Sequence, residues 1–165
     1  AAVAALCRAS LSRAETAVIP APLASRHLPA VAAIETAQLP SPISLRELHE
    51  MASRPGFRGF VTLPSADADP LGYALVLAGG GAADLVSVAV APAALRRGVA
   101  TRLLLYVFDA LATEGVEELC LEVAIDNAPA RALYDRLKFV EVGRRPGYYR
   151  RDRELIDALV MRRVL

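Results

Sequence analysis

Hydrophobic residues recur along this chain with two different periods, and the changes between them predict where strands and helices lie. The stretch Glu118–Ala124 alternates apolar and polar residues, as a strand with one buried face does. Between Val99 and Thr113 the apolar residues instead recur every three or four positions, which predicts a long helix with one apolar face. Gly115 follows that helix and ends it.

The same patterns predict the other elements. Strands are predicted at Glu15–Ile19, Phe57–Leu63, Leu71–Ala78, Asp84–Val90, Phe139–Val142 and Ile156–Val164. Helices are predicted from Ser25 to the proline-rich stretch after Leu39, from Ser44 to Met51 and over Ala128–Leu137, and a polar, aromatic loop at Arg144–Asp152. Ser25, Ser44 and Asn127 are the expected N-caps. Antiparallel strands followed by a right-handed parallel strand–helix–strand unit indicate a mixed α/β domain.

Turn residues mark the boundaries between these elements. Pro20 and Pro22 are expected to stop the first strand. The triple glycine Gly79–Gly81 predicts a hairpin, and it does not indicate a phosphate loop because no helix follows it. Asp67 and Asp69 fall in a polar connection, where a solvated turn is favoured over a metal site.

A short loop between the strand Asp84–Val90 and the long helix carries Arg96, Arg97 and Gly98. A helix N-terminus has unpaired backbone N–H groups and partial positive charge. A glycine there lets a ligand approach the backbone closely, and the two arginines add full charges. Strand, glycine turn and helix start together predict an anion site of the kind that binds phosphate.

Composition narrows the class of protein. The 165 residues suffice for one domain with a real core. Although 55% of the residues are hydrophobic, many are alanine, and we expect no membrane span. The net charge of +1 gives no broad reason to expect direct nucleic-acid binding. Cys120 falls in an apolar strand pattern far from Cys7, which favours a buried thiol over a disulfide. A free thiol in turn fits a cytoplasmic location.

The domain is expected to cover residues 14–165, behind an N-terminal extension of residues 1–13 that need not be ordered. The extension is rich in Ala, Arg and Ser and lacks acids. This composition fits a targeting segment, a cloning remnant or a frayed helix. No apolar secretory segment follows it, which favours the last two.

Several polar side chains are candidates for chemistry, and each has a plain structural alternative. Glu122 points opposite the apolar residues of its strand, so it faces a cleft or is a surface carboxylate. Tyr134, taken alone, fits an ordinary tyrosine of an amphipathic helix. His27 and His49 are expected on helix surfaces and lack the spacing of metal ligands.

Two adjacent tyrosines, Tyr148 and Tyr149, lie among four arginines in the predicted polar loop. Such a pair is typical of a surface that stacks on a peptide or on RNA. A basic surface hairpin without a binding role fits the same residues equally well.

The order and spacing of these pieces resemble the GNAT N-acetyltransferases, and among them the RimI-type ribosomal-protein alanine N-acetyltransferases. The resemblance covers roughly residues 14–164. It is carried by Val88–Thr101, Leu121–Val123, Asn127, Ala132–Tyr134, Phe139, Arg144–Tyr149 and Asp157–Met161. It implies the GNAT fold of class α/β (α+β), a mixed and mostly antiparallel sheet of about six or seven strands with about four flanking helices. It also implies a V-shaped split between the fourth and fifth strands.

The resemblance further implies the roles of individual residues. Glu122 matches the general base and Tyr134 the general acid. The co-substrate would be acetyl-coenzyme A, with no metal, and Tyr148 and Tyr149 match the substrate loop. Cofactor contacts carry over onto Val88, Ala89, Val90, Arg96, Arg97, Gly98, Val99, Ala100, Thr101 and Asn127.

The implied activity is acetylation of a protein N-terminus, with alanine of a ribosomal protein as one acceptor, by a cytoplasmic monomer or weak dimer. An α-amino group has a pKa of about 7.7–8.0 and a lysine about 10.4, so more of the α-amino group is deprotonated at neutral pH. Two alternatives stay open. One is a GNAT that acetylates a small amine such as an amino acid, a polyamine or an antibiotic. The other is a non-catalytic acyl-coenzyme A-binding module, against which the presence of Glu122 and Tyr134 argues.

Five positions depart from the family pattern. Ala94 and Leu95 replace an aromatic and a polar residue at the start of the loop, and Ala100 replaces its second glycine. The backbone N–H groups survive these changes, so cofactor binding should persist. Lys138 replaces a glycine, and a positive φ there would cost on the order of 1 kcal/mol. Ala124 stands where ribosomal-protein acetyltransferases often carry arginine, which bears on the substrate.

Overall fold

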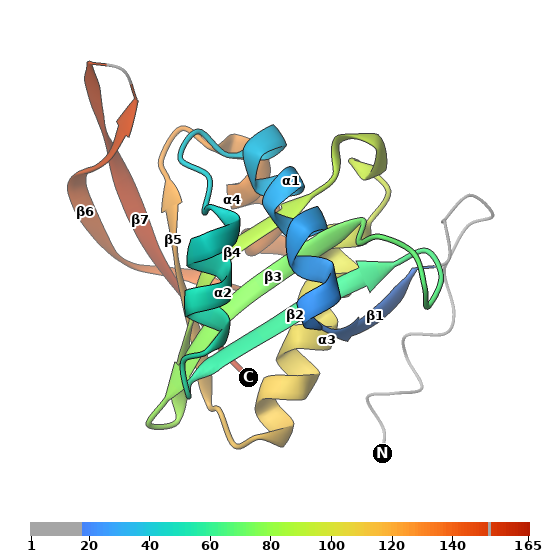
Figure 1. Ribbon diagram of the computed structural model, residues 1–165. Coiled ribbons are helices and arrows are strands. Elements are labelled where there is room, and N and C mark those ends of the chain that lie inside the picture. The colour runs from blue at the N-terminus through green and yellow to red at the C-terminus, as the bar shows by residue number, and fades with distance from the viewer. Residues whose placement is uncertain (1–17, 152) are drawn as a thin grey trace.

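A computed structural model of the chain describes residues 18–151 and 153–165, and its centre is one seven-stranded sheet (Figure 1). The strand order is β1-β2-β3-β4-β5-β7-β6. The strands are β1 (Ile19–Pro22), β2 (Phe57–Leu63), β3 (Gly72–Gly79), β4 (Ala82–Val90), β5 (Glu118–Ala124), β6 (Val140–Arg151) and β7 (Glu154–Val164). The helices are α1 (Leu28–Gln38), α2 (Leu45–Ala52), α3 (Val99–Thr113) and α4 (Ala128–Arg136). Neighbouring strands are antiparallel except β4 and β5, which are parallel.

Helices cover both faces of the sheet (Figure 1). The α1/α2 side buries Leu28, Val31, Ile34 and Leu48 against Val61, Leu63, Tyr73 and Leu75. The α3/α4 side buries Leu103, Leu104, Val107, Phe108, Tyr134 and Leu137 against Phe60, Ala74, Val76 and residues of β5. Because successive strand residues point to opposite faces, β2 and β3 contribute to both cores.

The sheet splits between β4 and β5, as the family resemblance implied. The two strands pair only over Ala82–Leu85 and Glu118–Leu121. In the pairing of β4 with β3, Leu75 faces Ser87 and Val76 faces Leu85, so Val86 is the extra residue of a β-bulge. A bulge bends its strand, and here it lies where the pairing with β5 ends. Beyond Leu85 the β5-facing backbone groups of β4 therefore have no partner in the β5 ladder.

Most of the predicted boundaries are confirmed to within one or two residues. Ser44 caps α2 by accepting the N–H of Glu47, and the two side chains form a capping box. Gly80 and Gly81 have φ of 63° and 83°, the left-handed conformation that a tight hairpin between antiparallel strands requires. Lys138 has a φ of 66°, so the expected strain at this position is present.

The first strand is the first correction. The prediction placed it at Glu15–Ile19 and stopped it at Pro20, whereas β1 begins at Ile19 and continues through Pro22, paired with Phe60–Leu63 of β2. The prolines are tolerated because β1 lies at the edge of the sheet, where one side of the strand has no ladder partner. Residues 15–17, like the extension of residues 1–13, lie outside the described residues.

The start of α1 is the second correction. Ser25 is not the N-cap, because Ser25–His27 form a 3₁₀ turn and α1 begins at Leu28. Pro29 occupies the first turn of α1, where a missing N–H leaves no helix bond unmade. His27 is buried rather than exposed, and its Nδ1 accepts the N–H of Ala24 at 3.0 Å. His49 is exposed as predicted.

The third correction concerns the predicted loop at Arg144–Asp152. β6 runs without interruption from Val140 to Arg151 and pairs with β7, forming a hairpin that projects from the sheet (Figure 1). The pairing contains two irregularities, and Gly147 has a φ of 59° at the second. Most side chains of β6 are exposed, so the strand lacks the alternation of apolar and polar residues that would have predicted it.

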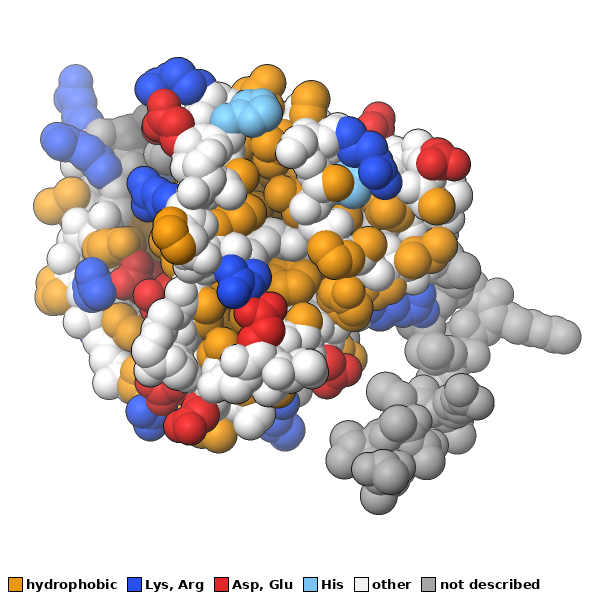
Figure 2. Space-filling model, turned by 60° about the horizontal axis from the view of Figure 1, so that its bottom comes forward, with side chains coloured by type: hydrophobic (Ala, Val, Ile, Leu, Met, Phe, Trp, Pro, Cys, Tyr) orange, Lys and Arg blue, Asp and Glu red, His pale blue; other side chains and the backbone are white. Residues whose placement is uncertain are grey.

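On the face that Figure 2 presents, basic and acidic side chains are interspersed. Among the described residues, no helix combines the length and the apolar character needed to cross a membrane. Cys120 is a free, half-buried thiol, less buried than the sequence predicted.

Candidate active site

Two cavities open at the split between β4 and β5. One has a volume of about 440 Å³ and the other about 530 Å³. Five residues line both of them: Leu39, Val88, Asn127, Ala130 and Tyr134. The two cavities therefore meet at one junction, bounded by β4 on one side and α4 on the other.

The larger cavity contains most of the predicted cofactor residues. Its lining includes Val88, Ala89, Val90, Arg96, Gly98, Val99, Ala100, Thr101 and Asn127. Gly98 precedes α3 with a φ of 74° and has no side chain to cap the helix, so the first N–H groups of α3 remain available to a ligand. Arg97 is exposed and does not line either cavity, so the structure does not bring it to the predicted site.

The smaller cavity contains Glu122, whose side chain is one quarter exposed. Arg145 reaches over from β6 and places its Nε 2.9 Å from Glu122 Oε1. The hydroxyl of Tyr148 donates a hydrogen bond to the same carboxylate, and this bond raises the pKa of Tyr148 above its ordinary value. Tyr149 lines the cavity as well, and its hydroxyl donates to the backbone oxygen of Glu122 at 3.1 Å.

Tyr134 lies at the junction of the two cavities on α4. It is buried, and its ring packs edge-on against Phe139 with 5.6 Å between the centroids. Burial raises the pKa of Tyr134 far above its ordinary value. The hydroxyl therefore keeps its proton at neutral pH and can act as a hydrogen-bond donor.

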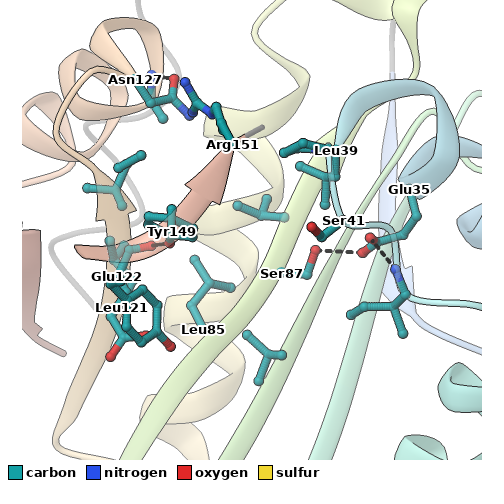
Figure 3. Close-up of a pocket in the computed structure, with 18 of the residues that line it drawn as sticks. Glu35, Leu39, Ser41, Leu85, Ser87, Leu121, Glu122, Asn127, Tyr149 and Arg151 are labelled. Atoms are coloured by element: carbon teal, nitrogen blue, oxygen red, sulfur yellow. Dashed lines mark hydrogen bonds between the residues drawn. The ribbon is translucent and has the colours of Figure 1, made fainter. Parts of the chain in front are cut away.

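The opposite wall of the smaller cavity consists of residues that the sequence did not indicate. Figure 3 shows Glu35 and Ser41 across the cavity from Glu122 and Tyr149. Glu35 is fully buried, and its one signal in the sequence was its position four residues after Val31, on the apolar face of α1. An acid at that position could only be interpreted once its partners were known.

Possible ligands for a metal are scattered. Within the ranges 18–151 and 153–165, no three His, Cys, Asp or Glu side chains form a group that could hold a metal ion. The polar groups that line the two cavities include backbone N–H groups at the start of α3, the hydroxyls of Tyr134 and Tyr149, and the carboxylate of Glu122. These are the groups that an acid–base transfer between two bound organic molecules would use.

The fold and the site thus combine a split sheet, an uncapped helix start beside one cavity, and a second cavity that meets the first. The model of the acetyltransferase (GNAT) family matches residues 28–139, and the chain belongs to this family. The α/β prediction and the predicted sheet of the GNAT fold are thereby confirmed.

Individual relatives place the chain within the family. It is 43% identical over 79 residues to the [ribosomal protein bS18]-alanine N-acetyltransferase of Salmonella typhimurium, a match over 48% of this chain and 53% of that protein. It is 36% identical over 94 residues to a mycothiol acetyltransferase of Clavibacter michiganensis, covering 56% of this chain and 31% of that protein. The chain thus spans about half or less of the length of these curated relatives. The crystal structure of the ribosomal-protein-S18-alanine N-acetyltransferase from Escherichia coli superimposes with a TM-score of 0.82 at 28% identity, covering 90% of this chain and 94% of that one.

Proposed function

We propose that this chain transfers the acetyl group of acetyl-coenzyme A to the α-amino group of a protein N-terminus. An N-terminal alanine of a ribosomal protein is the leading acceptor, by similarity to the relatives from Salmonella typhimurium and Escherichia coli. The observation that carries the proposal is that Val88, Asn127 and Tyr134 line both cavities. A thioester held in the larger cavity and an amine held in the smaller one would meet at these residues.

The larger cavity is suited to coenzyme A. Its pyrophosphate would take the N–H groups at the start of α3 and the charge of Arg96, and its amide-bearing arm would pair with the free edge of β4 beyond Leu85. The departures at Ala94 and Leu95 leave these backbone groups in place. Arg97 would contribute only long-range charge.

The smaller cavity is suited to the amine. The nitrogen lone pair attacks the thioester carbon, the C–S bond breaks, and an amide and a thiolate form. Glu122 takes the proton that the amine loses, directly or through water, and Tyr134 donates to the leaving sulfur. A backbone N–H near Val88 polarises the thioester oxygen.

An α-amino acceptor fits this chemistry better than a lysine. Its pKa of about 7.7–8.0 leaves a useful neutral fraction at pH 7, whereas a lysine at about 10.4 is almost fully charged. Glu122 is held by Arg145 and Tyr148, so it is a carboxylate with its acceptor positions partly occupied. Such a base is adequate for an amine that is already partly deprotonated.

A second candidate is acetylation of a small molecule. The match to a mycothiol acetyltransferase favours it, because that relative is named for mycothiol and not for a protein acceptor. The walls contributed by Tyr148, Tyr149 and the segment after α1 favour an extended acceptor instead. A third candidate is an acyl-coenzyme A-binding module without turnover.

The proposal is tested by measuring turnover of acetyl-coenzyme A with a peptide that begins with alanine. Small amines, and a peptide whose one free amine is a lysine side chain, are assayed beside it. Glu122→Gln and Tyr134→Phe should each lower kcat by about 100-fold or more, as loss of a general base or acid does. Glu141→Gln is the matched control, since it removes an exposed carboxylate that pairs with Arg144 on the projecting hairpin. It should leave kcat within twofold of the parent.

The outcomes separate the three candidates. Acetylation of the peptide with near-parental kcat in both variants would overturn the assigned roles. Faster acetylation of a small amine than of any peptide would support the small-molecule enzyme. Thermal stabilisation by coenzyme A without acetylation of any acceptor would support the binding module.

A further inference from the structure

The carboxylate of Glu35 is fully buried, and three hydrogen-bond donors converge on it. Tyr73 donates to Oε1 at 2.5 Å and Ser87 donates to the same oxygen at 2.6 Å. The backbone N–H of Ile43 donates to Oε2 at 3.0 Å. A buried acid is stable in a protein only when its oxygens are satisfied in this way.

The segment of residues 39–43 is closed at both ends by this one residue. At its start, the N–H of Leu39 donates to the backbone oxygen of Glu35 at 2.9 Å. At its end, the N–H of Ile43 donates to the Glu35 carboxylate. The two prolines inside the segment have no N–H to donate. The bond from Leu39 is the last backbone bond of α1, which any residue at position 35 would accept. The side chain of Glu35 therefore fixes the end of the segment, at Ile43.

The same carboxylate attaches the segment to the sheet at the split. Ser87 directly follows the bulge residue Val86 on β4, and Tyr73 lies on the neighbouring strand β3. Tyr73 is buried, and burial together with its bond to Glu35 raises its pKa far above the ordinary value, so its hydroxyl remains a donor. Figure 3 shows the bond between Glu35 and Ser87 beside the cavity.

The segment forms one wall of the smaller cavity through Leu39, Pro40, Ser41 and Ile43. Glu122 and Tyr149 lie on the other wall (Figure 3). Resting on the proposed function, we infer that Glu35 is a positioning residue that sets the width of the acceptor cavity and so limits the size of the acceptor's first side chain. Its carboxylate is engaged by Tyr73, Ser87 and Ile43, and it acts through the segment of residues 39–43.

Three variants test this inference: Glu35→Ala, Glu35→Gln and Ser87→Ala. Each is assayed with two peptides that differ only in a first residue of alanine or leucine. In Glu35→Ala the preference for alanine, measured as the ratio of kcat/KM values, should fall about tenfold, because a wall that defines a pocket discriminates by this order. KM for the alanine peptide should rise while KM for acetyl-coenzyme A stays unchanged, a split that general destabilisation would not produce.

Two conservative variants distinguish loss of the bond between Glu35 and Ile43 from a general loss of folding. Glu35→Gln keeps an oxygen for the two hydroxyls but turns an amide toward the N–H of Ile43. This variant should therefore retain the fold and still lose the preference for the alanine peptide. Hydrogen exchange at the Ile43 amide should accelerate in both Glu35 variants. Ser87→Ala removes one donor and should give an intermediate loss, which keeps the test decisive if Glu35→Ala fails to fold.

Thr62→Val is the matched control. Thr62 is also fully buried and donates to the backbone oxygen of Gly72, yet it lines neither cavity. It should leave the preference ratio unchanged. An unchanged ratio in both Glu35 variants, in an enzyme whose parent acetylates the peptides, would overturn the inference alone. A parent that acetylates neither peptide would overturn the proposed function, and the inference with it.

Discussion

The two walls of the smaller cavity are built by opposite means. The α1 wall, made of Glu35, Leu39, Pro40, Ser41 and Ile43, is fixed by a fully buried carboxylate with three donors. The hairpin wall, made of Glu122 of β5 with Tyr148, Tyr149 and Arg151 of β6, depends on partly exposed ion pairs, one of which joins Glu122 to Arg145. The side chains of Arg145 and Glu122 are 56% and 26% exposed, and those of Arg151 and Asp126 are 42% and 44% exposed.

Because of this difference, the two walls should contribute unequally to the stability of the fold. Removing one member of a buried polar network leaves unpaired groups in the interior and destabilises strongly. Exposed ion pairs contribute at most about 1 kcal/mol, because water solvates both charges well. The α1 wall is therefore part of what stabilises the fold. The β6 side chains Arg145 and Arg151, which form the exposed ion pairs beside the proposed base, can rearrange at little cost in folding free energy.

The largest expected change in the free energy of unfolding comes from a substitution that disrupts the α1 wall. Glu35→Ala should lower the free energy of unfolding by about 3 kcal/mol, because the hydroxyls of Tyr73 and Ser87 and the N–H of Ile43 lose their acceptor. Arg151→Ala, which removes one partner of the pair with Asp126, should change it by less than about 1 kcal/mol. Urea denaturation measures both. Equal losses in the two variants would contradict the comparison.

A smaller change in the free energy of unfolding, of the opposite sign, is expected at the residue that precedes β6. Lys138 joins α4 to β6 with a φ of 66°, a conformation that a side chain disfavours. Lys138→Gly should raise the free energy of unfolding by about 1 kcal/mol. Lys138→Ala keeps a Cβ and should bring no gain, so a stabilised alanine variant would show that loss of the charge, not relief of the backbone, is responsible.

The smallest expected change is a pH-dependent contribution of His27, just before α1, to the free energy of unfolding. Burial lowers the pKa of His27, with Arg26 lowering it further and Asp69 opposing them. The folded state therefore favours the neutral ring, which accepts the N–H of Ala24. This contribution to stability is present above the unfolded pKa of about 6.5 and is lost as the pH falls below it.

His27→Gln offers an uncharged acceptor at every pH and isolates this contribution. The difference in unfolding free energy between parent and variant should stay constant from pH 8 to 7 and then shift against the parent toward pH 5, as denaturation at each pH would measure. Parallel curves over the whole range would mean that His27 is not protonated on unfolding.

Much of the scaffold could be predicted because its signals are local. The capping box of Ser44 and Glu47, the glycines at the β3–β4 hairpin and the apolar stripe of α3 each depend on residues a few positions apart. The strand alternation around Glu122 also gave the correct bounds of β5. Each of these signals follows from the geometry of one element.

The errors arose where structure depends on distant partners. Pro20 reads as a strand breaker until its place at the sheet edge is known, and β6 lacks an apolar face because it projects from the domain. The bulge at Val86 is defined only by the register of β3 against β4. Glu35 could not be interpreted as part of a site, because Tyr73 and Ser87 are 38 and 52 residues away in the chain.

The closure of residues 39–43 by Glu35 also limits how this wall can vary in length. An insertion or deletion between Leu39 and Ile43 would shift the N–H of Ile43 relative to the Glu35 carboxylate, which is itself bonded to Tyr73 of β3 and Ser87 of β4. Substitution at Leu39, Pro40 or Ser41 can therefore change the shape of the wall and leave the bond from Ile43 in place, whereas a change in length disturbs it.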